Sequence, residues 1–184
     1  MKKLIVALSF GLIAFYGFAQ ESFSTETGHI KFYSHTSVED IEANNYKVIS
    51  KVTPSTGAIV FSVPMQSFEF EKALMQKHFN SGKFLDTKEF PKAKFKGLIR
   101  NLPDIDFSSN GTYIANVEGE LTIHGVTKNV SEQMTIEVSG NTAKGNAKFD
   151  VVLADYDVVF TKGKPSTNIA KTVEVTVALD LAKK

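Results

Sequence analysis

The sequence predicts an all-β protein with one short helical insertion, arranged as an eight-stranded antiparallel up-and-down barrel. Three observations support this prediction. Apolar and polar residues alternate along most of the chain, turn residues separate the alternating runs, and only one stretch has helical spacing. Roughly eight strands need protection at their edges, and closure into a barrel removes the edges. A two-sheet sandwich has the same alternation and remains the competing architecture.

The N-terminal segment has the features of a secretory signal peptide. Two lysines precede an apolar run over residues 4–18, and the small residues Gly17 and Ala19 occupy the −3 and −1 positions of a cleavage site. We therefore predict a signal peptide at residues 1–19, a periplasmic or secreted location, and a single mature domain at residues 20–184. A membrane anchor is the alternative, although a comfortable span needs about 20 apolar residues.

Composition excludes some partners and some stabilising devices. The chain has 21 basic and 20 acidic residues, a net charge of +1, and cleavage would leave 19 against 20, a net charge of −1. A concentrated basic face, which nucleic-acid binding usually needs, is not evident, so we expect no nucleic-acid partner. The chain has no Cys and hence no disulfide, whereas its 15 Phe supply apolar surface for a core or a pocket.

The first half of the chain contains three expected strands and the expected helix. The strands cover residues 30–36, 46–52 and 57–65, and the last of these has apolar residues at every second position. Pro64 must lie at a strand end or an unpaired position, because proline cannot donate a hydrogen bond to the ladder. Residues 70–80 carry apolar side chains at helical spacing with charged ones between them, which predicts a helix there.

The second half is a succession of hairpins. Strands are expected at residues 93–100, 113–123, 126–138, 143–153 and 172–180. Gly125 lies between two of them, where a tight turn requires a residue that tolerates positive φ. Residues 110–111 and 139–141 are further turns, and residues 155–166 form a polar loop with Gly and Pro. One face of each strand is apolar and the other polar, which is typical of a sheet with one dry face.

Two strings in the middle of the chain are more specific than the alternation. The first reads Phe84-Leu85-Asp86 and continues to Phe90-Pro91-Lys92-Ala93-Lys94-Phe95, and the second reads Gly119-Glu120-Leu121-Thr122-Ile123-His124-Gly125-Val126-Thr127-Lys128. Together they resemble the YceI-like family of secreted bacterial lipid-binding β-barrels, and the similarity covers most of residues 20–184. The resemblance implies a lipocalin-like barrel with an apolar tunnel for a polyisoprenoid chain, such as an isoprenoid quinone or a polyprenyl phosphate.

In such a barrel the isoprenoid-like lipid would contact apolar side chains that face the interior. The expected ligand-binding residues are Phe61, Val63, Phe68, Phe70, Met75, Phe79, Phe84, Phe95, Ile99, Val117 and Phe149. Loop lysines near the mouth, among them Lys83, Lys162 and Lys164, would meet a charged head group. A packed core uses the same apolar residues. The alternative is therefore a non-catalytic extracytoplasmic module with a filled core that acts through its surface.

No catalytic or metal-binding pattern stands out in the sequence. The four histidines, His29, His35, His78 and His124, show neither an HxH nor an HExxH spacing. A G-x-S-x-G string does not occur, and without Cys there is no thiol nucleophile. We therefore expect no enzyme activity, no metal site and no cofactor. We expect His78 to pin the helix end and His124 to lie on a polar face at a turn. Transient membrane contact and a dimer are both compatible with lipid binding.

Overall fold

The computed structural model describes residues 20–158 and 169–184. Its strands are β1 (Phe23–His35), β2 (Asp40–Thr53), β3 (Ala58–Pro64), β4 (Glu69–Phe70), β5 (Lys92–Ile99), β6 (Gly111–Ile123), β7 (Val126–Ser139), β8 (Thr142–Val152) and β9 (Thr172–Lys183). In these residues one α-helix, α1 (Ala73–Phe79), and three short 3₁₀ helices, η1 (Met65–Ser67), η2 (Leu102–Asp104) and η3 (Leu153–Tyr156), occupy the connections. The predicted signal peptide lies outside the described residues, as does most of the predicted loop at residues 155–166.

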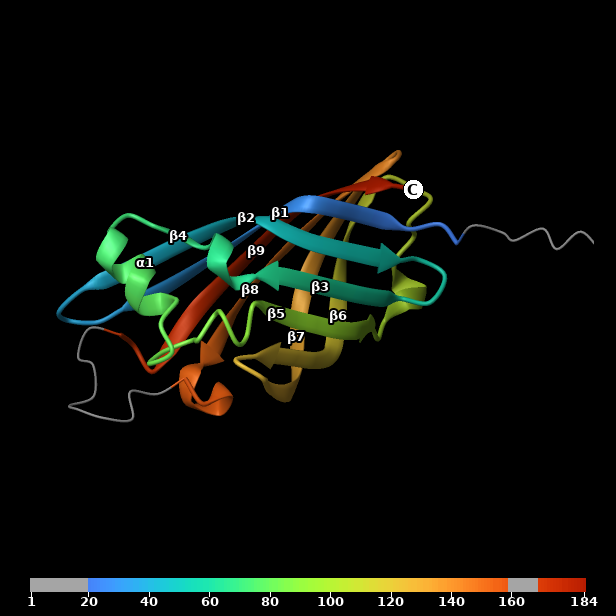
Figure 1. Cartoon of the computed structure of the whole chain (residues 1–184). Coiled ribbons are helices and arrows are strands. Elements are labelled where there is room, and N and C mark those ends of the chain that lie inside the picture. Colours follow the sequence, from blue (N-terminus) through green and yellow to red (C-terminus); the bar gives the residue numbers. More distant parts are fainter. Residues whose placement is uncertain (1–19, 159–168) are drawn as a thin grey trace, which may run out of the picture.

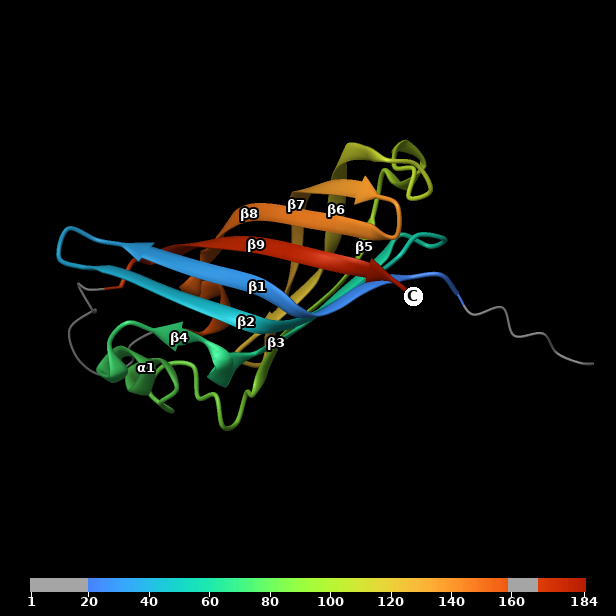
Figure 2. The ribbon, with the colours of Figure 1, turned by 90° about the horizontal axis from the view of Figure 1, so that it is seen from above.

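Eight of the strands form one closed antiparallel barrel. The hydrogen-bonded order is β1-β9-β8-β7-β6-β5-β3-β2, and the pairing of β1 with β2 closes the ring (Figure 1, Figure 2). The ninth strand, β4, has two residues and pairs with β2. The predicted eight-stranded antiparallel barrel with one short helix is therefore confirmed. A sandwich is ruled out, because a single continuous ring holds these strands.

β2 is longer than predicted, because the acidic segment before residue 46 joins the strand. It begins at Asp40. In the added segment Ile41 and Ala43 are buried, whereas Glu42 is exposed and forms an ion pair of 3.5 Å with Lys31 on β1. The alternation of inward apolar and outward polar residues therefore continues through a segment that the sequence prediction left out.

The helix is shorter than predicted. α1 begins at Ala73, because Phe70 lies in β4, where it pairs with Ala43 of β2. Lys72, which precedes the helix, has an extended backbone and makes no capping hydrogen bond with its side chain. The helix has seven residues, lies beside the barrel near one end (Figure 2), and buries Phe79. It therefore serves as a short cover for that end of the barrel.

The turns confirm two predictions about local geometry. Gly125 has a φ of 77°, and His124 before it has a φ of 51°, which is typical of a two-residue hairpin loop of type I′. A Cβ on Gly125 would lie 2.6 Å from Cε1 of Phe90, so the two sequence strings meet at this turn. Pro64 is the last residue of β3, as expected for a residue that cannot donate to the ladder.

The two ends of the barrel are filled differently. The packed end, which adjoins the β2–β3, β5–β6 and β7–β8 connections, is closed by the buried side chains Phe23, Val52, Ile59, Ile105 and Phe107. Ile105 and Phe107 come from the β5–β6 loop, which turns inward, and the rings of Phe23 and Phe107 lie 5.8 Å apart. The opposite end, which adjoins the β1–β2, β6–β7 and β8–β9 connections and residues 65–91, is called the open end.

Candidate ligand cavity

The open end contains a cavity of about 520 Å³. Its walls are inward-facing side chains of β1, β2, β3, β5, β6, β8 and β9, and residues between β3 and β5 cover one side. The volume falls within the range of roughly 300–1,000 Å³ that is typical of small-molecule sites. Most lining side chains are aliphatic or aromatic, so the cavity favours an apolar ligand. The barrel interior is therefore hollow at one end and filled at the other.

Five phenylalanines form an aromatic wall along one side of the cavity. Phe79 of α1 stacks on Phe32 of β1, with ring centroids 5.7 Å apart. Phe79 also contacts the rings of Phe70, Phe68 and Phe84 at 5.0, 5.4 and 6.3 Å. Four of the five come from the segment between β3 and β5. The local structure of that segment, with β4 before the helix and a loop after it, therefore places aromatic rings over the open end.

Two aromatic residues and two glycines lie close together on β3, β5 and β6, outside the lining of the larger cavity. Phe61 of β3 and Phe95 of β5 meet edge to face at 6.0 Å. Gly97 and Gly119 are cross-strand partners on β5 and β6. A Cβ on Gly97 would lie 2.5 Å from Cζ of Phe95, so the glycine leaves room for the ring to fold along its own strand. A smaller cavity of about 90 Å³ is lined by the rings of Phe61 and Phe95.

Ten of the eleven predicted ligand-binding residues line one of the two cavities. Val63, Phe68, Phe70, Met75, Phe79, Phe84 and Phe149 line the larger cavity, and Phe61, Phe95 and Val117 line the smaller one. Ile99 lies outside both: it is buried near the packed end, and its N–H donates to the carbonyl of Gly57 at 2.9 Å. Along β5, the position of a residue rather than its type determines whether it lines a cavity. Ala93 lines the larger cavity, whereas Ile99 lies in the packed core. Contact of these residues with a ligand stays a prediction.

Much of the remaining lining is missing from the predicted set. It includes Ile30, Phe32, Ile41, Met65, Leu85, Leu121, Ile123, Val151, Leu153, Tyr156, Val158, Val173 and Val175. Leu121, Val151 and Val173 belong to the apolar sets of their strands, so the two-residue period was the signal that could have found them. Tyr156 and Val158 lie in the stretch predicted as a polar loop, where no such period applies.

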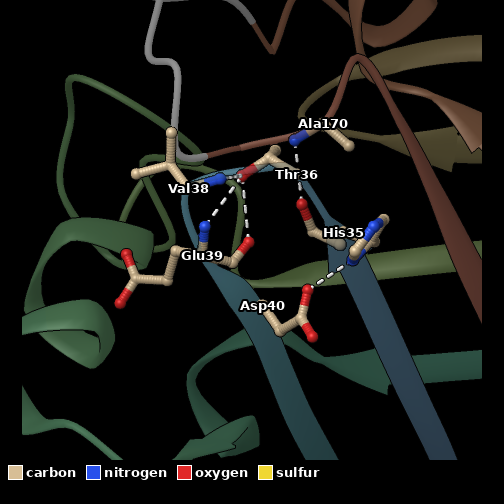
Figure 3. A network of polar contacts seen from close by, with 7 residues as sticks. His35, Thr36, Val38, Glu39, Asp40 and Ala170 are labelled. Carbon is tan, nitrogen blue, oxygen red and sulfur yellow. Dashed lines mark hydrogen bonds and ion pairs between the residues drawn. The ribbon is translucent and has the colours of Figure 1, made fainter.

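Several polar groups lie at the mouth of the cavity, around the turn between β1 and β2 (Figure 3). The hydroxyl of Thr36 accepts hydrogen bonds from the N–H groups of Val38 and Glu39 at 3.2 and 3.0 Å. The hydroxyl of Ser34 accepts one from the N–H of Ala170 at 2.8 Å, which ties β1 to the segment before β9. These backbone groups have partners within the protein, so the turn keeps a defined position beside the cavity.

Charged side chains around the mouth occur in opposite pairs. The Glu39 carboxylate lines the cavity and forms an ion pair of 2.7 Å with Lys72 just before α1, and this contact raises the pKa of Lys72. Asp40 lies 2.6 Å from Nδ1 of His35, and hydrogen bonds from His35 and then Tyr33 lower the pKa of Asp40. The Glu39–Lys72 pair joins the β1–β2 turn to the residue before α1, and the Asp40–His35 pair joins β2 to β1.

Tyr156 and His78 are the other polar residues of the lining. Tyr156 is buried, and burial raises the pKa of its hydroxyl. The carbonyl of His78 accepts hydrogen bonds from the N–H and hydroxyl of Ser81 at 3.1 and 2.7 Å, so its backbone ends the helix while its side chain lines the cavity. His124 departs from the prediction of a polar face: its Nδ1 lies 3.3 Å from the carbonyl oxygen of Tyr156, because the β6–β7 turn packs against η3.

Two kinds of feature are absent from the described residues, metal-ligand clusters and membrane-spanning helices. Within residues 20–158 and 169–184, no group of three or more His, Asp or Glu side chains is placed to hold a metal ion. In that same part of the chain, no helix has the length and apolar character needed to span a bilayer. Lys83 is exposed in the loop after α1, and the other two predicted head-group lysines, Lys162 and Lys164, lie outside the described residues.

A closed antiparallel barrel with one packed end and one hollow, apolar end defines a lipocalin-like binding barrel. Within that class, the chain belongs to the YceI-like domain family, whose family model matches residues 18–181. The match includes both sequence strings that carry the resemblance. The family expectation is thus confirmed over nearly the whole chain.

Sequence relatives and solved structures agree with this assignment. A UPF0312 protein of Pseudomonas fluorescens is 32% identical over 136 residues, 71% of this chain and 65% of that protein. A UPF0312 protein of Pseudomonas putida is 28% identical over 151 residues, 79% of this chain and 72% of that protein. A polyisoprenoid binding domain from Saccharophagus degradans, implicated in plant cell wall breakdown, has a TM-score of 0.74 at 12% identity and covers 90% of this chain and 99% of its own. Burkholderia cenocepacia BcnA has a TM-score of 0.68 at 19% identity and covers 84% of this chain and 96% of its own.

Proposed function

We propose that this protein is an exported, non-catalytic lipid-binding protein that holds an isoprenoid-like amphiphile in the cavity of its open end, for storage or transport. The ligand class is that of an isoprenoid quinone or a polyprenyl phosphate. The observation that carries the proposal is the apolar cavity of about 520 Å³ in a barrel of the YceI-like family. The structural relative from Saccharophagus degradans is a polyisoprenoid binding domain, which supports the same ligand class.

The physical chemistry of the interior suits an apolar chain. The aromatic wall and the aliphatic strands offer dispersion contacts, and a prenyl tail needs no hydrogen bond from them. Burial of one methylene contributes about 0.8 kcal/mol. Ten such groups contribute ~8 kcal/mol, close to a micromolar Kd before ordering costs. A module that acts only through its surface fits less well, because such a module has no use for a hollow open end.

The open end also presents apolar side chains to solvent. Leu74 of α1 is 62% exposed and Val38 of the β1–β2 turn is 60% exposed, the two highest values among the large apolar side chains of the described residues. The ion pair between Glu39 and Lys72 joins these two segments. Transient contact of Leu74 and Val38 with a bilayer would bring the mouth to the membrane in which such a ligand dissolves.

Native mass spectrometry of the protein, produced in a bacterial host and purified without detergent, tests this function. We expect a bound species that releases an isoprenoid lipid on activation. Val63→Trp places an indole ring in the cavity and should abolish this species while the far-ultraviolet circular dichroism stays unchanged. Ile114→Trp is the matched control, because Ile114 is exposed on the outer face of β6. If wild type carries no lipid and takes up no added geranylgeraniol, the proposal is wrong.

A further inference from the structure

Strand pairing in the barrel wall is incomplete between β7 and β8. The two strands pair only where Met134–Ser139 meets Thr142–Ala147. β7 nevertheless pairs with β6 over Val126–Val138, and β8 pairs with β9 as far as Val152. The ribbons of β7 and β8 diverge toward the β6–β7 turn and η3 (Figure 1). We call the unpaired seam between residues 126–133 of β7 and residues 148–152 of β8 the lateral window.

The smaller cavity lies behind the lateral window. Val130 and Glu132 of β7 and Ala147 and Phe149 of β8 line it, so both sides of the seam contribute to its wall. On its inner side this cavity shares lining residues with the larger one, namely Ile30, Val63, Ala93, Leu121 and Phe149. The two cavities therefore adjoin, and the smaller one lies between the larger cavity and the window.

An inward-facing carboxylate, Glu132, lies in the unpaired part of the seam. It is the cross-strand partner of Val117, which is buried inside the barrel, so the Glu132 side chain also lies on the inner face. Continuing the pairing of Met134 with Ala147 would set Glu132 directly opposite Phe149. Partial burial already raises the pKa of Glu132. Closing the seam would desolvate the carboxylate further against an aromatic ring, and an inward-pointing charge is a known way to prevent strand pairing.

The window has firm limits at both ends. The last β7–β8 pair, Met134 with Ala147, closes it toward the packed end. Toward the open end, the contact of 3.3 Å between His124 Nδ1 and the Tyr156 carbonyl oxygen joins the β6–β7 turn to η3. The outward side chains of β7 along the seam are polar and exposed, namely Thr127, Asn129, Ser131 and Gln133. The window therefore has polar, exposed side chains on its outer side and the smaller cavity behind it.

We propose that the lateral window is an exit through which the far end of a long prenyl tail leaves the barrel. This inference rests on the proposed function, because it requires a lipid in the larger cavity. A tail that is longer than the larger cavity continues into the smaller one and emerges between β7 and β8, where no backbone hydrogen bond has to break. The barrel then accepts long tails as readily as short ones.

Affinities for prenyl alcohols of different length test the exit. Farnesol, geranylgeraniol and solanesol are offered to the full mature chain from detergent micelles, and bound fractions are measured by native mass spectrometry. Ala147→Phe fills the passage from β8, and Val130→Trp fills it from β7. We expect each variant to bind solanesol about tenfold more weakly than wild type and to bind farnesol within about threefold of wild type. Asn146→Phe is the control, because Asn146 is exposed on the outer face beside Ala147.

The outcomes separate this inference from the proposed function. If the variants lose affinity equally for all three alcohols, or lose none, the exit is wrong, while the cavity remains a lipid site. Failure of wild type to bind any of the alcohols would overturn the proposed function and the exit together. The two variants lie on different strands, so if one of them misfolds the other still tests the exit.

A labelled cysteine gives an independent readout. The chain has no native Cys, so Gln133→Cys places a unique thiol at the rim of the window. Its side chain is exposed and only donates to Asn116 at 3.1 Å, so bimane attached there should leave the fold intact. We expect solanesol to shift the bimane emission to the blue and farnesol to leave it unchanged. The same shift with both alcohols would contradict an exit that only long tails reach.

Discussion

The packed end and the open end of this barrel are built from the same strands and the same kinds of residue, yet one is filled and the other is hollow. At the packed end, the β5–β6 loop inserts Ile105 and Phe107 between the strands, and Phe107 lies 5.8 Å from Phe23. At the open end, α1 covers the barrel from the side and leaves about 520 Å³ empty. The connections, rather than the strands, therefore decide whether the interior becomes core or cavity.

Several aromatic residues of the open end are less buried than Phe23 of the packed end, although Phe68 and Phe79 are buried there. Phe23 at the packed end is fully buried. Phe32, Phe70, Phe84 and Phe149 at the open end are only partly buried. A partly buried ring beside an empty volume lacks contacts on one side, which lowers its contribution to stability. The hollow end thus keeps apolar surface available for a ligand and gives up packing energy.

The largest expected contrast comes from truncating one phenylalanine at each end. Phe23→Ala should lower the free energy of unfolding by about 3–5 kcal/mol, because it leaves a new cavity in a packed core. Phe149→Ala should cost clearly less, because Phe149 already borders both cavities. Urea unfolding of lipid-free protein, followed by circular dichroism, gives both values. Equal losses would mean that the open end is as tightly packed as the other.

The two substitutions should affect lipid binding in the opposite order, with the larger loss of affinity in Phe149→Ala. Phe149→Ala removes an aromatic surface from the cavity and should weaken uptake of geranylgeraniol, whereas Phe23→Ala should leave the affinity of the folded fraction close to that of wild type. Measuring both variants well below their unfolding temperatures separates affinity from stability. A loss of affinity in Phe23→Ala alone would contradict the assignment of the ligand to the open end.

A smaller effect is expected where Gly97 of β5 and Gly119 of β6 are cross-strand partners. A Cβ on Gly119 would lie 2.4 Å from Cα of Gly97, and backbone atoms cannot yield as a flexible side chain can. Gly119→Ala should therefore destabilise the protein by about 1–3 kcal/mol, as overpacking does. Gly82→Ala is the control, because its nearest neighbour is the carboxylate of Asp86 at 3.3 Å. Thermal unfolding measures both, and an unchanged midpoint for Gly119→Ala would show that β5 and β6 can separate.

The strands were predictable because their signals are local. The apolar sets of β6 to β9, the positive φ at Gly125 and the terminal position of Pro64 follow from alternation and turn chemistry. The start of α1 was not predictable in this way. Phe70 has helical spacing with Leu74, four residues later, but it pairs with Ala43, a residue far away in the sequence. Such a long-range partner overrides the local periodicity.

The site was only partly predictable for a related reason. Alternation tells which side chains face inward, but it does not tell whether a neighbour fills the space beside them. Ala93 and Ile99 share one face of β5, and only Ala93 lines the large cavity. The lateral window, in contrast, has a sequence signal. Glu132 interrupts the apolar set of β7 at an inward position between Val130 and Met134.

The smallest expected effect concerns the carboxylate of Glu132. It lies in the unpaired seam of the barrel wall, whereas β7 and β8 are paired toward the packed end. Desolvation, and then the charge of Asp150, raise the pKa of Glu132 above its usual 4.5, so its charged form destabilises the folded state. Glu132→Gln should therefore raise the stability at pH 7 by less than about 1 kcal/mol, because the side chain is partly solvated. This advantage should decline as the pH falls through the folded pKa of Glu132 and vanish below 4.5. Thermal midpoints of wild type, Glu132→Gln and the exposed, fully paired control Glu137→Gln across this pH range measure it. An advantage that persists at acidic pH would instead mean that Gln packs better than Glu, and that charge does not hold the seam open.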